Sequence, residues 1–486
     1  MTNTTTRTIT CAHLIAGAAT QPATAQRIEI AGNDITAVGG ADGVMTEPLL
    51  ALPVLVNAHD HGRAIRSSSI GAAGKPLESW LHHLALFPSV DPYLAAVVAL
   101  SNSALGGTGV VMVHYTRAQG FSALPEEATE VARAARDVGV RVGFAVSMKN
   151  RNPLVYGASE PVLTALPPDA QAEIEQRFFR TPLAPRDQIA LADAVADAAA
   201  GPNFDVQYGP NGVQWCSDAL LEAVAEASQR SGRRVHMHLL ETRYQRAWLD
   251  AAYPDGAVRH LDRIGLLTPR LTLAHCVWAR PDELELLAER GVTIVVNTSS
   301  NLHLRSGIAP AVSMINSGCR IALGIDDRAL DDDHDALREL RLSQLLHAGS
   351  GFTTAISQTQ MLQAAFGNGR LAVTNSPRGG TIEPGAPADL LLLDWAALDD
   401  DGLREALNPL DLLFSRATAR HIREVIVGGR TIVRDRRVLG VNLEASRREV
   451  LAQIRAGMSA NRTLAKAMPA LDRAIAHCFE PDHPCC

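Results

Sequence analysis

The sequence predicts an α/β protein whose central part is a (β/α)8 TIM barrel, and three observations support this. Short apolar runs alternate with helical patterns through the middle of the chain. About eight such runs occur, which favours a closed parallel barrel over an open sheet. Histidine and acidic residues follow several of the runs, at the strand ends where a barrel carries its catalytic groups.

The composition is that of a globular chain with a large core. Of its 486 residues, 47% are hydrophobic and 20% charged, so a large barrel and a smaller module fit within it. The net charge is -7 without a dense Lys/Arg tract, so we expect no nucleic-acid partner. No apolar run is long enough for a membrane span, and residues 1–10 lack the apolar core of a signal peptide. Irregularly spaced cysteines favour a reduced, cytoplasmic protein.

Both ends of the chain are rich in strand patterns. Near the start, Arg27–Ile30 alternates polar and apolar residues, and Ile35–Val38 resumes the alternation after a turn. Near the other end, a Gly-Gly turn separates Val425–Val427 from Thr431–Val433. Both patterns predict hairpins. The residues from Glu444 to Ile475 follow with helical spacing.

The central part contains the strand and helix candidates of the predicted barrel. The strand candidates are Pro53–Asn57, Val110–His114, Val142–Val146, Asp205–Tyr208, Arg234–His238, Leu271–His275, Thr293–Asn297 and Arg320–Gly324. Helical spacing occurs in Asp218–Gln229, Pro281–Glu289 and Asp335–Leu346.

Four of these strand candidates end in residues that bind metals. His59 and His61 follow the first, and because alternate residues of an extended segment share a face, both imidazoles reach one ion. His238 and Asp326 complete a set of three nitrogens and one oxygen, which suits Zn²⁺ and also Fe²⁺. Each residue alone is explained as well by a structural role. Their occurrence together at separate strand ends favours a site with one divalent metal.

Two further residues are candidates for acid/base chemistry. Glu241 lies three residues beyond His238, too far along to be an obvious ligand and close enough to reach water on the metal. We expect Glu241 to move a proton between that water and the leaving group. His275 ends the sixth strand candidate, and we expect it to orient the water or stabilise the attacking oxygen.

These motifs resemble those of the amidohydrolase superfamily, over roughly residues 8–445. The branch that they most resemble contains cytosine and guanine deaminases, S-adenosylhomocysteine deaminases and triazine hydrolases. The motifs are Asn57–His61, His236–Thr242, Ala274–Cys276, Leu323–Asp327, the loop Asn297–Leu302 with Ser306-Gly307, and Gly385–Leu390.

The resemblance implies a domain organisation and a set of roles. Residues 1–52 and 381–445 would form a composite β-sandwich, residues 53–380 the catalytic barrel, and residues 446–486 a helical segment and tail. It implies His59, His61, His238 and Asp326 as ligands, with Glu241 and His275 catalytic. Asp326 would also hold the attacking water. Two-metal members carry a bridging lysine at the fourth strand, and because residues 205–210 contain none, a single metal is expected.

The candidates for substrate binding lie in loops. Arg63 follows the first ligand pair and would meet an anionic or carbonyl-rich substrate. Trp80 lies in the long first loop, and Asn301 and His303 lie in the seventh. The alternatives are that Arg63 faces solvent, that Trp80 only packs its loop onto the barrel, and that His303 is an ordinary loop residue.

The predicted function is that of a metal-dependent aminohydrolase, which removes an amino group from a nitrogen heterocycle. The alternative is hydrolysis of an amide, urea, carbamate or cyclic amide at the same site, because activated water and Glu241 serve either leaving group. A different class, a catalytically silent binding protein, is disfavoured because the ligand set is complete. We expect a small-molecule substrate, no membrane partner and a homo-oligomer.

Overall fold

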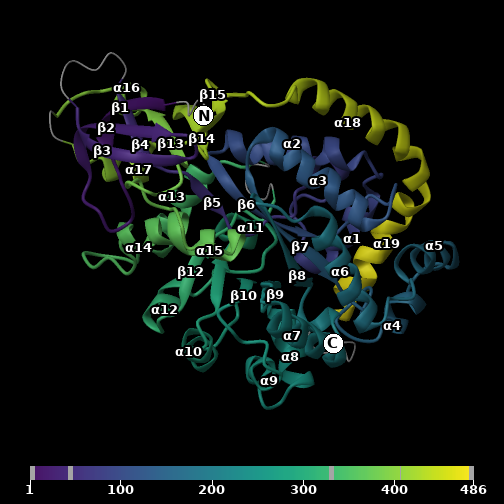
Figure 1. The fold of residues 1–486 in the computed structure, drawn as a ribbon. Helices are drawn as coiled ribbons and strands as arrows, with labels where there is room; N and C mark the ends of the chain where they lie inside the picture. Colours follow the sequence, from purple (N-terminus) through teal and green to yellow (C-terminus); the bar gives the residue numbers. More distant parts are fainter. Residues whose placement is uncertain (1–5, 42–47, 328–332, 405–406, 481–486) are drawn as a thin grey trace.

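The barrel is formed by an eight-stranded parallel sheet (Figure 1). The structure, a computed structural model, describes residues 6–41, 48–327, 333–404 and 407–480. The order of the barrel strands follows the chain. They are β5 (Leu55–Asn57), β6 (Thr108–Tyr115), β7 (Arg141–Met148), β8 (Phe204–Pro210), β9 (Val235–Leu239), β10 (Leu271–His275), β11 (Thr293–Val296) and β12 (Arg320–Leu323). Every predicted barrel strand therefore occurs, and the predicted fold class is confirmed.

Two backbone hydrogen bonds join the first and last strands where they end. The Ala58 N–H donates to the Leu323 carbonyl and the Asp326 N–H to the His59 carbonyl, both at 2.9 Å. These bonds close the barrel at its carboxyl edge. They also bring the segment after β5 against the segment after β12, and both segments carry predicted metal ligands.

Helices surround the barrel (Figure 1). One of the three predicted helices, α7, begins where the Ser217 side chain accepts from the Leu220 N–H, and ends at Gly232 with φ 72°. The helices of the barrel and its loops are α1 (Leu77–His83), α2 (Pro92–Leu105), α3 (Leu124–Val138), α4 (Glu160–Thr164), α5 (Pro168–Phe178), α6 (Pro185–Ala199), α7 (Asp218–Ser231), α8 (Arg243–Ala252), α9 (Ala257–Arg263), α10 (Pro281–Glu289), α11 (Thr298–His303), α12 (Ala311–Asn316), α13 (Ala336–His347), α14 (Gln358–Gln363) and α15 (Gly369–Thr374).

The two ends of the chain build a second sheet, with strand order β16-β15-β14-β13-β4-β1-β2-β3. Arg7 on β1 donates to Glu424 on β14 at 2.7 Å, although two strands separate them in the ladder, so the sheet is strongly curled. Both predicted hairpins occur, as β2–β3 and β14–β15. The elements are β1 (Thr6–Leu14), β2 (Ala23–Ala31), β3 (Asp34–Gly40), β4 (Leu49–Pro53), β13 (Leu390–Asp394), β14 (Ile422–Val427), β15 (Arg430–Arg434) and β16 (Arg437–Val438), with α16 (Trp395–Leu398) and α17 (Pro409–Arg416) between them.

The last described part of the chain is helical, as predicted. Figure 1 shows α18 (Leu443–Gly457) and α19 (Arg462–Cys478) in yellow, running from the second sheet along the barrel to α1, α4 and α5. Val450 on α18 is buried against α2. Residues 481–486 of the predicted tail lie outside the described residues. Within the described part of the chain, no helix is both long and apolar enough for a membrane span.

Candidate metal centre and active site

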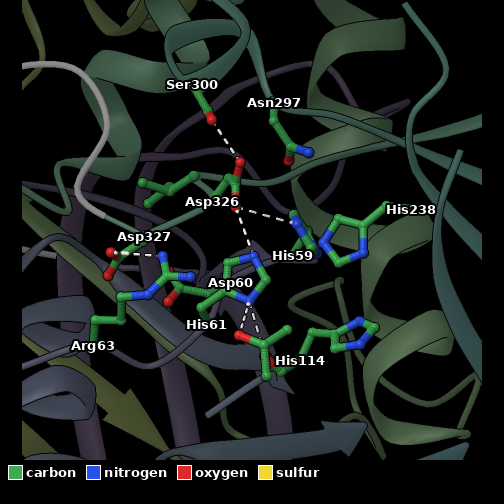
Figure 2. Close-up of polar contacts among 12 residues, drawn as sticks. His59, Asp60, His61, Arg63, His114, His238, Asn297, Ser300, Asp326 and Asp327 are labelled. Carbon is green, nitrogen blue, oxygen red and sulfur yellow. Dashed lines mark hydrogen bonds and ion pairs between the residues drawn. The ribbon is translucent and has the colours of Figure 1, made fainter. Parts of the chain in front are cut away.

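The predicted metal ligands converge at the carboxyl edge of the barrel (Figure 2). The Nε2 atoms of His59 and His61 both lie 3.2 Å from Oδ1 of Asp326. One ligand atom from each of these residues lies within 4.8 Å of the others, and the same holds for His59, His238 and His275. Residues at the carboxyl ends of β5, β9, β10 and β12, within or just after each strand, thus surround one point.

Main-chain carbonyls orient two of the histidines. Nδ1 of His61 lies 2.9 Å from the His114 carbonyl, and Nδ1 of His238 lies 2.7 Å from the Asn211 carbonyl. A carbonyl only accepts, so in both rings Nδ1 carries the proton and donates. Nε2 therefore keeps its lone pair for a metal.

His59 has the properties of a ligand whose partner is a cation. Its ring is fully buried, and its nitrogens make no hydrogen bond within the described residues. Burial lowers its pKa to about 4, so the imidazole is neutral at physiological pH. If Nε2 of His59 carries no proton, its lone pair faces the carboxylate of Asp326 across 3.2 Å, and neither group offers the other a donor. A metal ion between them would satisfy both.

The carboxylate of Asp326 is held in its charged form. Burial opposes ionisation, but His59 and His61 outweigh it and lower the pKa of Asp326 well below its usual value. The Ser300 hydroxyl donates to the other oxygen, Oδ2, at 2.5 Å. Asp326 is thus an acceptor-only side chain among imidazole rings, which is the chemistry of a metal ligand.

The backbone at the strand ends is unusual. Leu240, His275 and Asp326 have φ angles of 52°, 76° and 56°, in the left-handed region that favours glycine. Gly324 makes the close approach before Asp326 possible, because a Cβ there would lie 2.2 Å from Oδ1 of Asn297. Strained turns of this kind cluster at functional sites.

Glu241 and His275 face each other beside the ligands. Oε2 of Glu241 lies 3.6 Å from Nε2 of His275, and the Ser306 hydroxyl donates to Oε1 at 3.2 Å. Glu241 is 2% exposed, and burial raises its pKa to about 7. Nδ1–H of His275 donates to Oδ1 of Asn301 at 2.9 Å, which turns Nε2 toward Glu241.

A cavity of about 750 Å³ opens onto this group. His61, His238, Glu241, His275 and Asp326 all contribute to its lining. Its volume lies within the range of small-molecule sites.

The structure divides the four residues predicted to bind substrate into two pairs. Arg63 and Trp80 line the cavity, with the guanidinium 5.1 Å from the centre of the indole ring. Arg63 also donates to Asp327 at 3.1 Å. Asn301 and His303 are not among the lining residues, and Asn301 instead lies behind His275. Their contact with substrate stays a prediction.

The family follows from a comparison with known proteins. A model described as "Amidohydrolase family" matches residues 50–432, most of the chain. The chain belongs to the amidohydrolase family. This amidohydrolase is 31% identical to a 5-methylthioadenosine/S-adenosylhomocysteine deaminase from Nitratidesulfovibrio vulgaris, over 84% of this chain and 86% of the relative. The family is metal-dependent and its members are hydrolases.

Two other comparisons extend this result. The amidohydrolase is 33% identical to a 5'-deoxyadenosine deaminase from Methanosarcina barkeri, but the match covers only 50% of this chain and 56% of the relative, about half of its length. The structure of an adenosine deaminase from Xanthomonas campestris with bound zinc has a TM-score of 0.74 at 23% identity, covering 92% of this chain and 98% of that chain. This structural likeness supports the fold.

Several residues around the amidohydrolase site escaped the sequence analysis. Asn211 and His114 act through their carbonyls, which leave no signal in the residue type. Ser300 and Ser306 lie within or beside the recognised loop motif, yet nothing in the sequence pairs them with Asp326 and Glu241.

Glu78 is a further residue that was missed. It lines the cavity and is 5% exposed. Its Oε1 accepts from Tyr156 at 2.8 Å and from Thr242 at 2.5 Å. These partners lie 78 and 164 positions away, so only the folded chain reveals the contacts.

Proposed function

We propose that this amidohydrolase deaminates a nitrogen heterocycle by hydrolysis, at a site with one divalent metal ion. The observation that carries the proposal is the convergence of His59, His61, His238 and Asp326 beside a buried glutamate with a pKa of about 7. In the net reaction, water adds to the carbon that bears the amino group, a carbonyl forms, and ammonia leaves.

The donor set fits zinc. Three neutral imidazoles and one carboxylate match the ligands that zinc takes in hydrolytic sites, and iron is the alternative. No lysine occurs in β8, where two-metal members carry their bridging residue, which supports a single ion. When bound, the ion supplies a Lewis acid that makes water a nucleophile at neutral pH.

The protein's own groups supply the proton transfers. Glu241, with a pKa near neutrality, accepts a proton from the attacking water and delivers it to the ring nitrogen. Glu241 then accepts the second proton from the added hydroxyl, as the carbonyl forms, and delivers it to the amine, which leaves as ammonia. His275 and Asp326 hold the water in position, because Nε2 of His275 and Oδ2 of Asp326 lie 3.9 Å apart at the edge of the cavity.

The relatives indicate which heterocycle to test first. Those in M. barkeri and N. vulgaris are named as deaminases of 5'-deoxyadenosine and of 5-methylthioadenosine or S-adenosylhomocysteine. We therefore take an aminopurine nucleoside as the first candidate substrate class.

The test combines metal content with ammonia release. Zinc-loaded wild type, Glu241→Gln and His238→Ala would be assayed with aminopurines, aminopyrimidines, pterins and triazines. We expect about one metal per chain in wild type and its loss in His238→Ala. Glu241→Gln should keep the metal and lose about 100-fold or more in kcat.

Glu285→Gln, at an exposed position of α10, is the matched control and should match wild type. Unchanged turnover in Glu241→Gln would refute the assigned role. Ring opening or amine release from cyclic amides or ureas, without ammonia from heterocycles, would replace deamination with the other reaction class at the same site.

A further inference from the structure

Positive charges gather on one part of the cavity wall. They come from the segments that follow β5, β6 and β7 and from the region of α5. Of the lining carboxylates, Glu241 and Asp326 follow β9 and β12, whereas Glu78 lies on α1 and accepts hydrogen bonds from Tyr156 and Thr242. The lining cations are Arg63, Arg117, Lys149, Arg177 and Arg180.

Two of these arginines are fixed close together. Arg177 donates to the Ala85 carbonyl at 2.6 Å, and Arg117 donates to the Phe87 carbonyl. Both carbonyls belong to one short segment of the first loop. Burial and the positive charges of Arg177 and Arg63 lower the pKa of Arg117 to about 10. Within the described residues, neither Arg117 nor Arg177 has a carboxylate partner.

Lys149, which directly follows β7, is another cation of the cavity wall. More than a third of its surface is free, and the residue lines the cavity. Surrounding protein nevertheless lowers the pKa of its ammonium group. No ion pair with Lys149 occurs among the residues that the structure describes. Lys149 therefore adds positive charge to the cavity wall, but it is not part of the arginine pair.

We propose that Arg117 and Arg177 bind an anionic group of the substrate, a carboxylate or a phosphate attached to the aminated heterocycle. Like charges that are held together away from water cost free energy, and a bound anion offsets this cost. Guanidinium groups anchored by carbonyls keep free N–H groups, which suit carboxylate and phosphate oxygens. This inference rests on the proposed function and narrows its substrate to the anionic members of the class.

The first test compares three probes on the zinc-loaded full chain: 5'-deoxyadenosine, adenosine 5'-monophosphate and an adenosine with a 5'-carboxylate. We expect kcat/KM for one anionic probe to exceed that of the neutral probe by about tenfold or more. The anionic probe with the higher kcat/KM shows whether the bound group is a phosphate or a carboxylate. Equal kcat/KM for all three would overturn the inference.

The second test removes the two arginines singly, as Arg117→Gln and Arg177→Gln, with Arg186→Gln on the exposed surface of α6 as the control. Each cavity variant should raise KM for the anionic probe by about tenfold, and raise it less for the neutral probe. The preference should also shrink at high ionic strength. Equal losses for both kinds of probe would overturn the inference.

A binding measurement separates this inference from the proposed function. Inorganic phosphate and acetate would be titrated calorimetrically into wild type and both cavity variants. Binding that the variants weaken, without ammonia from any heterocycle, would refute deamination and leave the anion subsite standing. The opposite result is ammonia release from a heterocycle, with no preference for anionic probes and no anion binding that the variants weaken. It would support deamination and refute the anion subsite.

Discussion

Two histidines of the proposed site are oriented by hydrogen bonds to neighbouring residues. The Asn211 carbonyl sets the tautomer of His238, and the Asn301 amide oxygen sets that of His275. The difference between the two anchors matters for mutagenesis. A main-chain carbonyl survives substitution of its residue, whereas the anchor of His275 is a side chain that mutation removes.

We predict that Asn301→Ala lowers kcat by about 10- to 100-fold, because Nδ1 of His275 loses its acceptor and Nε2 its orientation. Metal content should stay at the wild-type value, since Asn301 contacts no predicted ligand of the metal. Asn301→Asp, which keeps an acceptor oxygen, should lose less activity. Equal losses in the two variants, or loss of the metal, would contradict this role.

At the scale of the element, hydrogen bonds hold α19 against α1, the helix that carries Trp80 in the cavity wall. Asp472 on α19 accepts from Lys75 at 2.8 Å, Ser79 at 2.5 Å and His83 at 3.0 Å. Burial opposes the charge of Asp472, but these three partners outweigh it and lower its pKa. The end of the chain thus helps to fix the first loop.

We predict that Asp472→Ala loosens α1, raises KM several-fold and destabilises the protein by about 1–3 kcal/mol, because the partners of the lost carboxylate stay partly buried. Steady-state kinetics and limited proteolysis would measure the two effects. Asp197→Ala, at an exposed position of α6, is the control. Unchanged KM and an unchanged cleavage pattern would show that the contact has no role in shaping the cavity.

At the scale of the molecule, Asp389 joins the second sheet to the barrel. Its carboxylate accepts from Arg141 at 3.0 and 3.1 Å, from Arg370 at 2.6 Å and from the Gly428 N–H at 2.6 Å. Arg141 begins β7 and Arg370 lies on α15, so one buried group connects three parts of the fold. Burial opposes its ionisation, but both arginines outweigh burial and lower its pKa.

We predict that Asp389→Asn lowers the free energy of unfolding by about 3–5 kcal/mol at pH 7, because two guanidinium groups lose their counter-charge. A depressed carboxyl pKa contributes stability above the unfolded value of about 3.9, and this contribution is lost as pH falls through the folded value. The difference between wild type and variant should therefore narrow below about pH 4.

Urea unfolding at pH 7 and below about pH 4 would measure the difference in unfolding free energy between wild type and Asp389→Asn, as long as the transition stays two-state. Asp282→Asn, which removes one member of an exposed pair with Arg259, should cost less than about 1 kcal/mol. A difference that does not change with pH would contradict the assigned charge interaction.

The structure brings together the residues that were selected by their type at a strand end, while their roles in metal binding and catalysis stay predictions. These residues are His59, His61, His238, Asp326, Glu241 and His275. Asn301 shows the limit of the method. A loop motif predicts that a residue matters, but whether its side chain meets substrate or another side chain depends on the direction in which the loop folds.

By itself, the sequence determined the order of the barrel strands, the hairpins at the chain ends and the chemical types at the site. Those features follow from spacing over a few residues, which the backbone geometry of strands and turns converts directly into structure. Only the tertiary structure decided the curled second sheet, the cations of the cavity and the contact of Asp472 with His83. That last contact joins residues 389 positions apart, and no local pattern encodes such a distance, because it arises when the whole chain packs around one core.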